Sequence, residues 1–173
     1  MLLHELPIGP NAPAEVNCVI EIPKGSSNKY EYEPETGTMR LDRVLYSPLH
    51  YPCDYGFIPT TRYLDGDPLD VLVLVTHATF PACVVSARPV GVLMMADDKG
   101  PDEKILAVAA GDPRFADTRS LSGVQDHLRK ELIHFFEVYK ALEWKAVEVL
   151  GWKDIDVALQ LINKFRLDKP QGE

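Results

Sequence analysis

The sequence predicts an α+β fold, in which a small closed β-barrel precedes a long helix and a shorter C-terminal helix. Strand-like runs separated by turn-forming Gly, Pro, Asn and Asp fill the first two-thirds of the chain. In the last third, apolar residues recur three or four positions apart, as they do in amphipathic helices. Short strands with frequent turns favour a closed barrel or a sandwich over alternating βα units.

Seven segments of the first two-thirds are expected to form strands. Val16–Ile22 is a mostly apolar run that ends before Pro23 and Gly25. Lys29–Glu33 alternates charged and aromatic residues, the pattern of a half-buried strand. The other expected strands are Met39–Tyr46, Tyr55–Ile58, Asp70–Val75, Cys83–Met95 and Lys104–Ala109.

Two helices and a short strand are expected in the last third. The stripe of the long helix runs from Leu121 to Leu142, and Ser122 and Gln125 have the spacing of a capping box at its start. A short strand is expected at Val147–Leu150. A second helical stripe follows, made of Ile155, Leu159, Ile162 and Phe165.

Length and charge narrow the classes of protein. A chain of 173 residues has the size of one domain, so residues 1–173 are expected to form a single domain. It carries 18 Lys and Arg against 26 Asp and Glu, a net charge of −8. A sequence-independent nucleic-acid binder needs a basic face, so we expect no nucleic-acid partner.

Cysteine usage and hydropathy predict a soluble cytoplasmic protein with no membrane partner. Cys18, Cys53 and Cys83 are odd in number and form no C-x-x-C pair, which argues against a disulfide framework and a zinc site. The first residues lack the basic region of a signal peptide. The longest uncharged run, 71–87, contains His77 and Pro81 and is too short to span a bilayer.

The strongest local motif is Asp65-Gly66-Asp67-Pro68-Leu69-Asp70, which leads directly into an apolar strand. Carboxylates this close raise one another's pKa unless a positive charge joins them, and Mg²⁺ with its oxygen ligands would supply that charge. Asp70 lies at the start of a buried strand and needs a partner. A polar turn that caps the strand remains an equal alternative on spacing alone.

A second acidic segment, 97–104, contains Asp97, Asp98, Asp102 and Glu103. By itself it reads more simply as an exposed hairpin loop. Both acidic segments adjoin strong strands, however, and a barrel can bring them to the same end. Carboxylates that converge there would form a site for two or more metal ions.

Phosphate binding would need fixed cations and hydroxyl donors near these carboxylates. Arg can hold phosphate oxygens with two hydrogen bonds, Lys acts as a point charge and Tyr donates one hydrogen bond. Each such residue alone is more often a surface or core residue. The candidates are Lys29, Arg43, Lys104, Tyr51, Tyr55, Tyr139 and Lys140.

Taken together, these motifs resemble the family I soluble inorganic pyrophosphatases of the bacterial type. The D-G-D-P-x-D signature matches Asp65–Asp70, and the supporting motifs follow in the family's order from about residue 15 to 145. They are Val19-Ile20-Glu21-Ile22-Pro23, Lys29-Tyr30-Glu31, Asp42-Arg43, Tyr51-Pro52-x-Asp54-Tyr55-Gly56, Arg88-Pro89-Val90-Gly91 and His134-Phe135-Phe136-Glu137-x-Tyr139-Lys140.

The resemblance implies a five-stranded OB-like barrel that hydrolyses inorganic pyrophosphate to two orthophosphates. It implies several Mg²⁺ ions per subunit, with Mn²⁺ as a substitute, and assembly into a homohexamer. Asp67 would be the general base. The metal ligands would be Asp65, Asp70, Asp97 and Asp102; the phosphate-binding residues Lys29, Arg43, Tyr55, Tyr139 and Lys140; and the supporting residues Glu21, Glu31, Tyr51 and Lys104.

Two other functions stay open at this point. A non-catalytic OB-type module would bind an oligonucleotide or a protein through basic grooves and stacking aromatic side chains. The net charge of −8 disfavours that alternative. A metal-dependent phosphatase acting on nucleotides or other organic phosphates would share the acidic motifs, although no motif for base stacking or ribose binding is evident.

Overall fold

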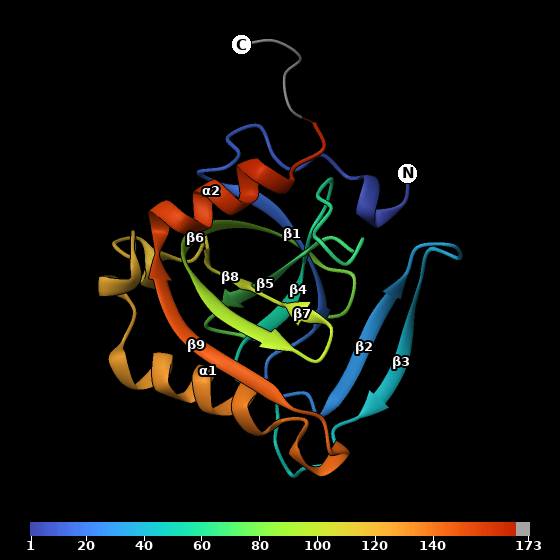
Figure 1. Ribbon diagram of the computed structural model, residues 1–173. Helices are drawn as coiled ribbons and strands as arrows, with labels where there is room; N and C mark the ends of the chain where they lie inside the picture. The colour runs from blue at the N-terminus through green and yellow to red at the C-terminus, as the bar shows by residue number, and fades with distance from the viewer. Residues whose placement is uncertain (169–173) are drawn as a thin grey trace.

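The computed structural model describes residues 1–168 and confirms the α+β class (Figure 1). The strands are β1 (Val16–Ile22), β2 (Asn28–Glu33), β3 (Thr38–Val44), β4 (Asp54–Ile58), β5 (Leu69–Leu74), β6 (Val84–Asp97), β7 (Gly100–Pro101), β8 (Lys104–Ala109) and β9 (Val147–Asp154). The helices are α1 (Asp126–Val138) and α2 (Ile155–Phe165). Within the described residues, no helix is long and apolar enough to cross a membrane.

The expected five-stranded closed barrel is confirmed. Neighbouring strands pair in the order β1-β4-β5-β8-β6, and the additional pairing of β6 with β1 closes the ring. All of these pairings are antiparallel except that of β5 with β8. Each of the five strands therefore has a partner on both sides, and such closure protects a small β-protein from edge-to-edge aggregation.

Strand β5 shows why the apolar runs form buried strands. Its side chains alternate between the two faces of the sheet, so Val71 and Val73 enter one hydrophobic cluster while Leu72 and Leu74 enter the other. The cluster that holds Leu72 also contains side chains of α1, and the cluster that holds Val71 contains side chains of α2. Both faces are therefore covered, as expected for a continuous apolar run.

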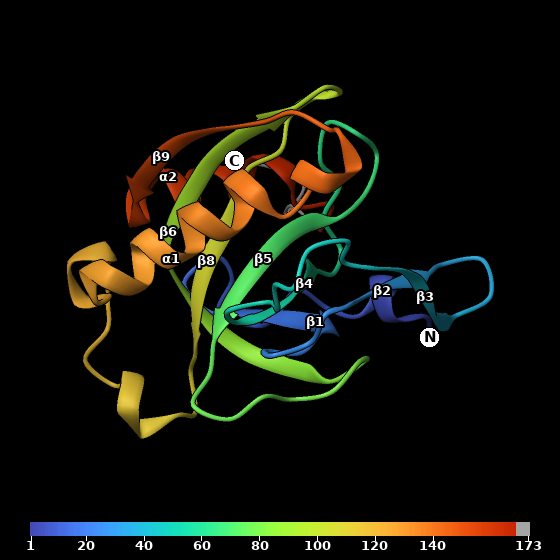
Figure 2. The same ribbon diagram turned by 90° about the horizontal axis from the view of Figure 1, so that it is seen from below.

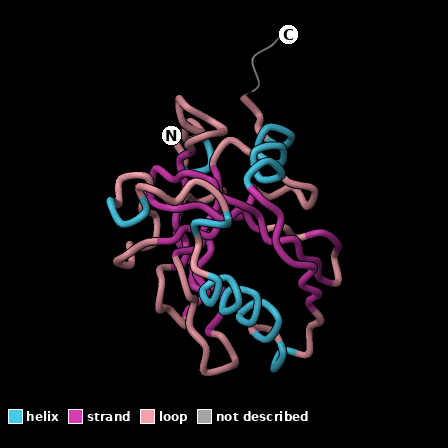
Figure 3. Tube along the Cα trace, turned by 90° about the vertical axis from the view of Figure 1, so that its left-hand side faces the viewer, coloured by secondary structure: helices cyan, strands magenta, loops and turns pink. Residues whose placement is uncertain are grey.

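The two helices cover opposite sides of the strands. Leu132, Phe135 and Phe136 form the buried face of α1, which packs against β9 (Figure 2). Helix α2 buries Ala158 and Ile162 and packs mainly against β6. Figure 3 shows α1 and α2 at opposite ends of the molecule, with the strands between them.

The predicted start of the long helix is wrong. Helix α1 begins at Asp126, and Gln125 caps it without a side-chain hydrogen bond, so there is no capping box with Ser122. Residues 121–123 form a separate 3₁₀ turn instead. The backbone N–H of Leu121 donates to the carboxylate of Asp154, and its side chain packs on Gly91, contacts that hold this segment out of the helix.

Several predicted strand ends also differ from the structure, by at most four residues. β9 continues to Asp154, well beyond Leu150, because β6 pairs with it as far as the partners Gly91 and Asp154. β3 ends at Val44, before the expected Tyr46. Paired with β2, it forms a separate two-stranded hairpin that projects beside the barrel (Figure 1).

Candidate active site

A cavity of about 440 Å³ lies where the barrel, the β2–β3 hairpin and the end of α1 meet. Both acidic segments contribute to its lining, so the expectation that the barrel brings them together is confirmed. All predicted site residues except Tyr51 line it: Glu21, Lys29, Glu31, Arg43, Tyr55, Asp65, Asp67, Asp70, Asp97, Asp102, Lys104, Tyr139 and Lys140.

The first acidic segment is a turn that is held by its own backbone. Asp65 accepts a hydrogen bond from the backbone N–H of Asp67 at 3.0 Å, and Gly66 has a φ of +94°, which favours glycine. Tyr63 N–H donates to the carbonyl of Asp67 at 2.7 Å. Asp65 and Asp67 are exposed on this turn, whereas Asp70 is the second residue of the buried strand β5.

The second acidic segment is a tight hairpin between β6 and β7. Asp97 pairs with Gly100, and its carboxylate accepts a hydrogen bond from the backbone N–H of Lys99 at 2.8 Å. The hairpin interpretation of this segment is thus correct. Asp97, Asp98 and Asp102 nevertheless line the cavity, so the hairpin also contributes to the site.

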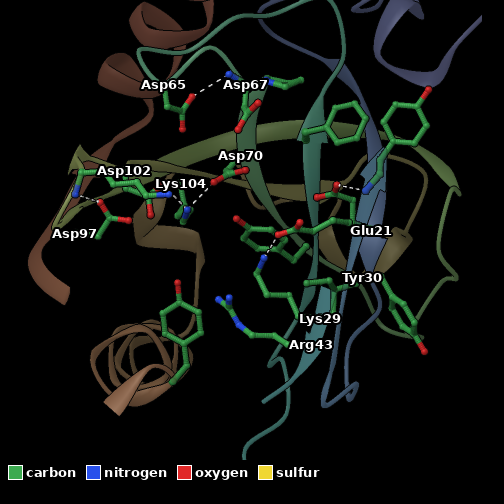
Figure 4. A pocket seen from close by; sticks show the side chains of 18 of the residues that line it. Glu21, Lys29, Tyr30, Arg43, Asp65, Asp67, Asp70, Asp97, Asp102 and Lys104 are labelled. Atoms are coloured by element: carbon green, nitrogen blue, oxygen red, sulfur yellow. Dashed lines mark hydrogen bonds and ion pairs between the residues drawn. The ribbon is translucent and has the colours of Figure 1, made fainter. Parts of the chain in front are cut away.

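Lys104 joins the two acidic segments (Figure 4). Its Nζ lies 2.5 Å from Asp70 Oδ2 and 2.6 Å from Asp102 Oδ1, and the residue is 3% exposed. Burial alone would lower the pKa of Lys104, but the two carboxylates raise it above its ordinary value, so the ammonium stays charged. This is the partner that the position of Asp70 required.

Two of the cavity carboxyl groups, those of Asp67 and Asp102, have a raised pKa. Burial and the neighbouring Asp65 and Asp70 raise the pKa of Asp67. Burial raises the pKa of Asp102 as well, with a further contribution from Asp70 and Asp97 that Lys104 partly offsets. Such a cluster attracts divalent cations, and its oxygen-only donors match the preference of Mg²⁺.

The carboxylates do not form a ready-made cation cage. Within residues 1–168, no group of three or more His, Cys, Asp or Glu side chains is arranged closely enough to hold a metal ion. Their chemistry and their common cavity fit a divalent cation, and binding would require side-chain rotation toward it. Exposed Asp65 and Asp67 have room for such rotation.

Glu21 projects from β1 into the cavity (Figure 4). Its Oε1 accepts a hydrogen bond from the backbone N–H of Tyr32 at 2.8 Å, which ties β1 to β2. Burial raises the pKa of Glu21 to about 8, and Asp70 adds to this shift. Keeping the ionised carboxylate of Glu21 in this buried position therefore lowers the stability of the folded protein.

The β2–β3 hairpin supplies cations on the opposite wall. Lys29 and Arg43 are register partners across the two strands. The Nζ of Lys29 contacts Glu31 and lies 3.4 Å from Asp42 Oδ2. Asp42 is also 3.4 Å from Arg43 Nη1, so one carboxylate holds both cations.

Aromatic residues complete the cavity. Burial raises the pKa of Tyr55 and of Tyr139 well above the ordinary value, so both remain neutral hydroxyl donors. Lys140, two residues after the end of α1, has a lowered pKa because of burial. Tyr51 is 2% exposed and packs against Tyr55 and Phe135, at centroid distances of 5.6 Å and 4.8 Å, behind the cavity wall.

Several residues of this region were not among the predicted site residues. Asp42 was identified from the sequence only as part of the Asp42-Arg43 motif, and no role was assigned to it. Asp98 and Lys99 belong to the acidic segment 97–104, whereas His4 and Lys145 line the cavity through tertiary placement and have no local sequence signal for it. Glu143 does not line the cavity, but it forms an ion pair with Arg43 from behind the wall.

The chain matches one family model, described as Inorganic pyrophosphatase, over residues 18–168. An inorganic pyrophosphatase of Methanosarcina acetivorans is 53% identical over 150 residues, which cover 87% of this chain and 89% of the relative. An inorganic pyrophosphatase of Thermus thermophilus is 50% identical over 161 residues, covering 91% and 92%.

Solved structures give the same result. The crystal structure of an inorganic pyrophosphatase from Thermus thermophilus superposes with a TM-score of 0.94 and 46% identity, covering 99% of this chain and 100% of that one. An inorganic pyrophosphatase of Helicobacter pylori has a TM-score of 0.90 at 40% identity, covering 97% and 99%.

Proposed function

This chain belongs to the family I inorganic pyrophosphatases, a family of hydrolases, and from that membership we propose that it hydrolyses inorganic pyrophosphate to two orthophosphates. The observation that carries the proposal is the division of the cavity lining into two charged walls. The carboxylates of the turn before β5 and of the β6–β7 hairpin form one wall, and the cations of the β2–β3 hairpin form the other. Pyrophosphate is a compact anion that binds divalent cations, so it would match both the acidic wall, through those cations, and the cationic wall.

The cationic wall would hold the substrate. Arg43 can contact two phosphate oxygens at once, and Lys29 and Lys140 add point charges. Tyr55 and Tyr139 remain protonated and each donate one hydrogen bond. These fixed donors would stabilise the charge that develops on the leaving phosphate, which is the main task of a protein in phosphoryl transfer.

The acidic wall would hold Mg²⁺, with Mn²⁺ as a substitute, through Asp65, Asp70, Asp97 and Asp102. When bound, such cations offset the charge of the phosphates and lower the pKa of water. The oxygen-only donor set supports this assignment, as does the pKa of Asp67 and of Asp102, each raised by burial and by neighbouring carboxylates.

Asp67 would act as the general base. Its carboxylate accepts a proton from the attacking water, whose oxygen bonds to one phosphorus atom while the bridging P–O bond breaks. The bridging oxygen leaves with the second phosphate. Burial and neighbouring carboxylates raise the pKa of Asp67, and a raised pKa makes a carboxylate a better proton acceptor.

Four residues would support this arrangement. Lys104 holds Asp70 and Asp102 in place, and Tyr51 packs behind Tyr55. Glu21 ties β1 to β2, and Glu31 contacts the Nζ of Lys29.

Assembly and location are further parts of the proposal. We infer a homohexamer in the cytoplasm, with residues 1–173 acting as a single domain. The three cysteines are free, and Cys18 and Cys53 are buried, which suits a reducing compartment.

The test is release of orthophosphate from pyrophosphate, measured with Mg²⁺ and again with excess EDTA. The proposal expects release that requires Mg²⁺ and far exceeds release from ATP or a phosphomonoester under the same conditions. A purified protein that releases no phosphate from pyrophosphate above a blank would contradict it.

A further inference from the structure

Arg43 lines the cavity and forms ion pairs with two carboxylates, neither of which lines the cavity itself. Asp42 precedes it on β3 and lies 3.4 Å from its Nη1. The second partner, Glu143, lies about a hundred residues later in the chain, in the 3₁₀ turn Ala141–Glu143 after α1. Glu143 Oε1 is 3.2 Å from Arg43 Nε. This contact therefore connects the β2–β3 hairpin to the end of α1.

Glu143 is unusually buried for a carboxylate at the molecular surface. Its side chain is 5% exposed, whereas the next residue, Trp144, is 95% exposed. Trp144 has a φ of +57°, and this left-handed backbone reverses the chain so that Lys145 N–H contacts the carbonyl of Lys140. The turn thereby places Glu143 inward, against the cationic wall.

Two buried atoms of this ion pair have no hydrogen-bond partner among the residues that the structure describes. Within residues 1–168, Glu143 Oε2 and Arg43 Nε are buried and form no hydrogen bond. Lys145 Nζ lies 4.0 Å from Glu143 Oε1, so the carboxylate stands behind two cations that line the cavity. A buried carboxylate is costly unless it is paired, which argues that Arg43 and Lys145 retain it.

We propose that Glu143 is a positioning residue that holds the guanidinium of Arg43 toward the substrate phosphate; this rests on the proposed function. Glu143 contacts Nε and Asp42 contacts Nη1, so the two carboxylates hold the guanidinium at different nitrogens while Arg43 lines the cavity. A guanidinium held in this way loses less rotational freedom when substrate binds. The β2–β3 hairpin stands beside the barrel (Figure 1), and the ion pair ties it to the turn that follows α1.

The kinetic test is a double-mutant cycle with Glu143→Ala and Arg43→Ala. In the presence of Arg43, Glu143→Ala is expected to lower kcat/KM for pyrophosphate about three- to tenfold, the usual coupling between contacting charged groups. The loss should fall mainly on KM, because Arg43 contacts phosphate before the reaction as well as during it. In the Arg43→Ala background the same change should have an effect of less than about twofold.

Two variants separate positioning from folding. Glu143→Gln keeps the volume and a hydrogen-bond acceptor, and it should restore part of the loss. Glu148→Ala removes an exposed carboxylate from nearby β9 and should leave kcat/KM at the wild-type value. Equal effects of Glu143→Ala with and without Arg43, or no effect in either, would overturn the proposal.

A second readout does not depend on turnover. Phenylglyoxal modifies free guanidinium groups, and mass spectrometry of peptides gives the rate at each arginine. Glu143→Ala should speed the modification of Arg43 about threefold or more and leave exposed Arg40 on the same strand unchanged. An unchanged rate at Arg43 would overturn the inference. A wild-type chain without pyrophosphate hydrolysis would contradict the proposed function instead, while the labelling rates still decide whether Glu143 holds Arg43.

Discussion

The ammonium of Lys104 lies 2.5 Å from the carboxylate of Asp70 at the start of β5. A second carboxylate, Asp102, lies 2.6 Å from the same ammonium on its other side. One buried cation thus joins acidic residues that are 32 positions apart in the chain (102 − 70). This contact connects the two acidic segments that line the cavity.

Replacing Lys104 with Met should destabilise the protein. Two carboxylates would lose their buried counter-charge, and breaking a buried pair typically costs about 3 kcal/mol or more. We expect a loss of about 3 kcal/mol in the free energy of unfolding in EDTA, and a smaller loss with millimolar Mg²⁺ because the added cation offsets the same carboxylates. Urea unfolding in both buffers measures this. Lys99→Met, at an exposed lysine, is the control, and equal stability of both variants would contradict the account.

Glu21→Gln should stabilise the metal-free protein at alkaline pH. Burial raises the pKa of Glu21 from 4.5 to about 8 in the folded state. Since the folded protein retains a proton that the unfolded chain releases, stability falls as the pH rises from 4.5 to about 8 and stays lower above that. Gln does not ionise and can still accept the hydrogen bond of Tyr32.

The expected gain is therefore near zero at pH 4 and about 2 kcal/mol at pH 9, while activity falls. Unfolding by urea in EDTA at the two pH values gives the comparison. A gain of the same size at both pH values would show that ionisation of Glu21 is not the cause.

Trp144→Gly should stabilise the turn after α1. Trp144 adopts a φ of +57° and is 95% exposed, so its side chain contributes little packing within the chain to offset the strain. Glycine adopts this conformation without a Cβ clash, and we expect a gain of about 1 kcal/mol in the free energy of unfolding. Trp144→Ala removes the indole without relieving the strain and should give no such gain. Equal stability of the two variants would refute the strain argument.

Local patterns were sufficient to predict most strands of the barrel and the two acidic segments that line the cavity. Alternating and apolar runs predicted the strands of the ring, since burial of one or both faces is a property of neighbouring residues. The turn at Asp65–Asp70 was also predictable, because Gly and Asp determine its backbone conformation locally. The need of Asp70 for a partner was also evident, because it adjoins a buried strand.

Features that depend on distant contacts were not predictable in this way. Ser122 has the local pattern of a helix cap, but the contacts of Leu121 with Asp154 and Gly91 prevent the helix from starting there. The pairing of Glu143 with Arg43 has no local signal, because the partners are separated by nearly the whole barrel in sequence. Tyr51 lies behind the cavity wall and not in its lining, and this position depends on its packing against Phe135 of α1.

The central claim is that Asp67 accepts the proton of the attacking water in a Mg²⁺-dependent hydrolysis of pyrophosphate. The most direct measurement is phosphate release by the wild type and by Asp67→Asn, each at saturating Mg²⁺. Asn keeps the size of the side chain but accepts no proton, so we expect kcat to fall at least about a hundredfold, with stability little changed. A variant that retains the wild-type kcat would contradict the claim and exclude Asp67 as the base.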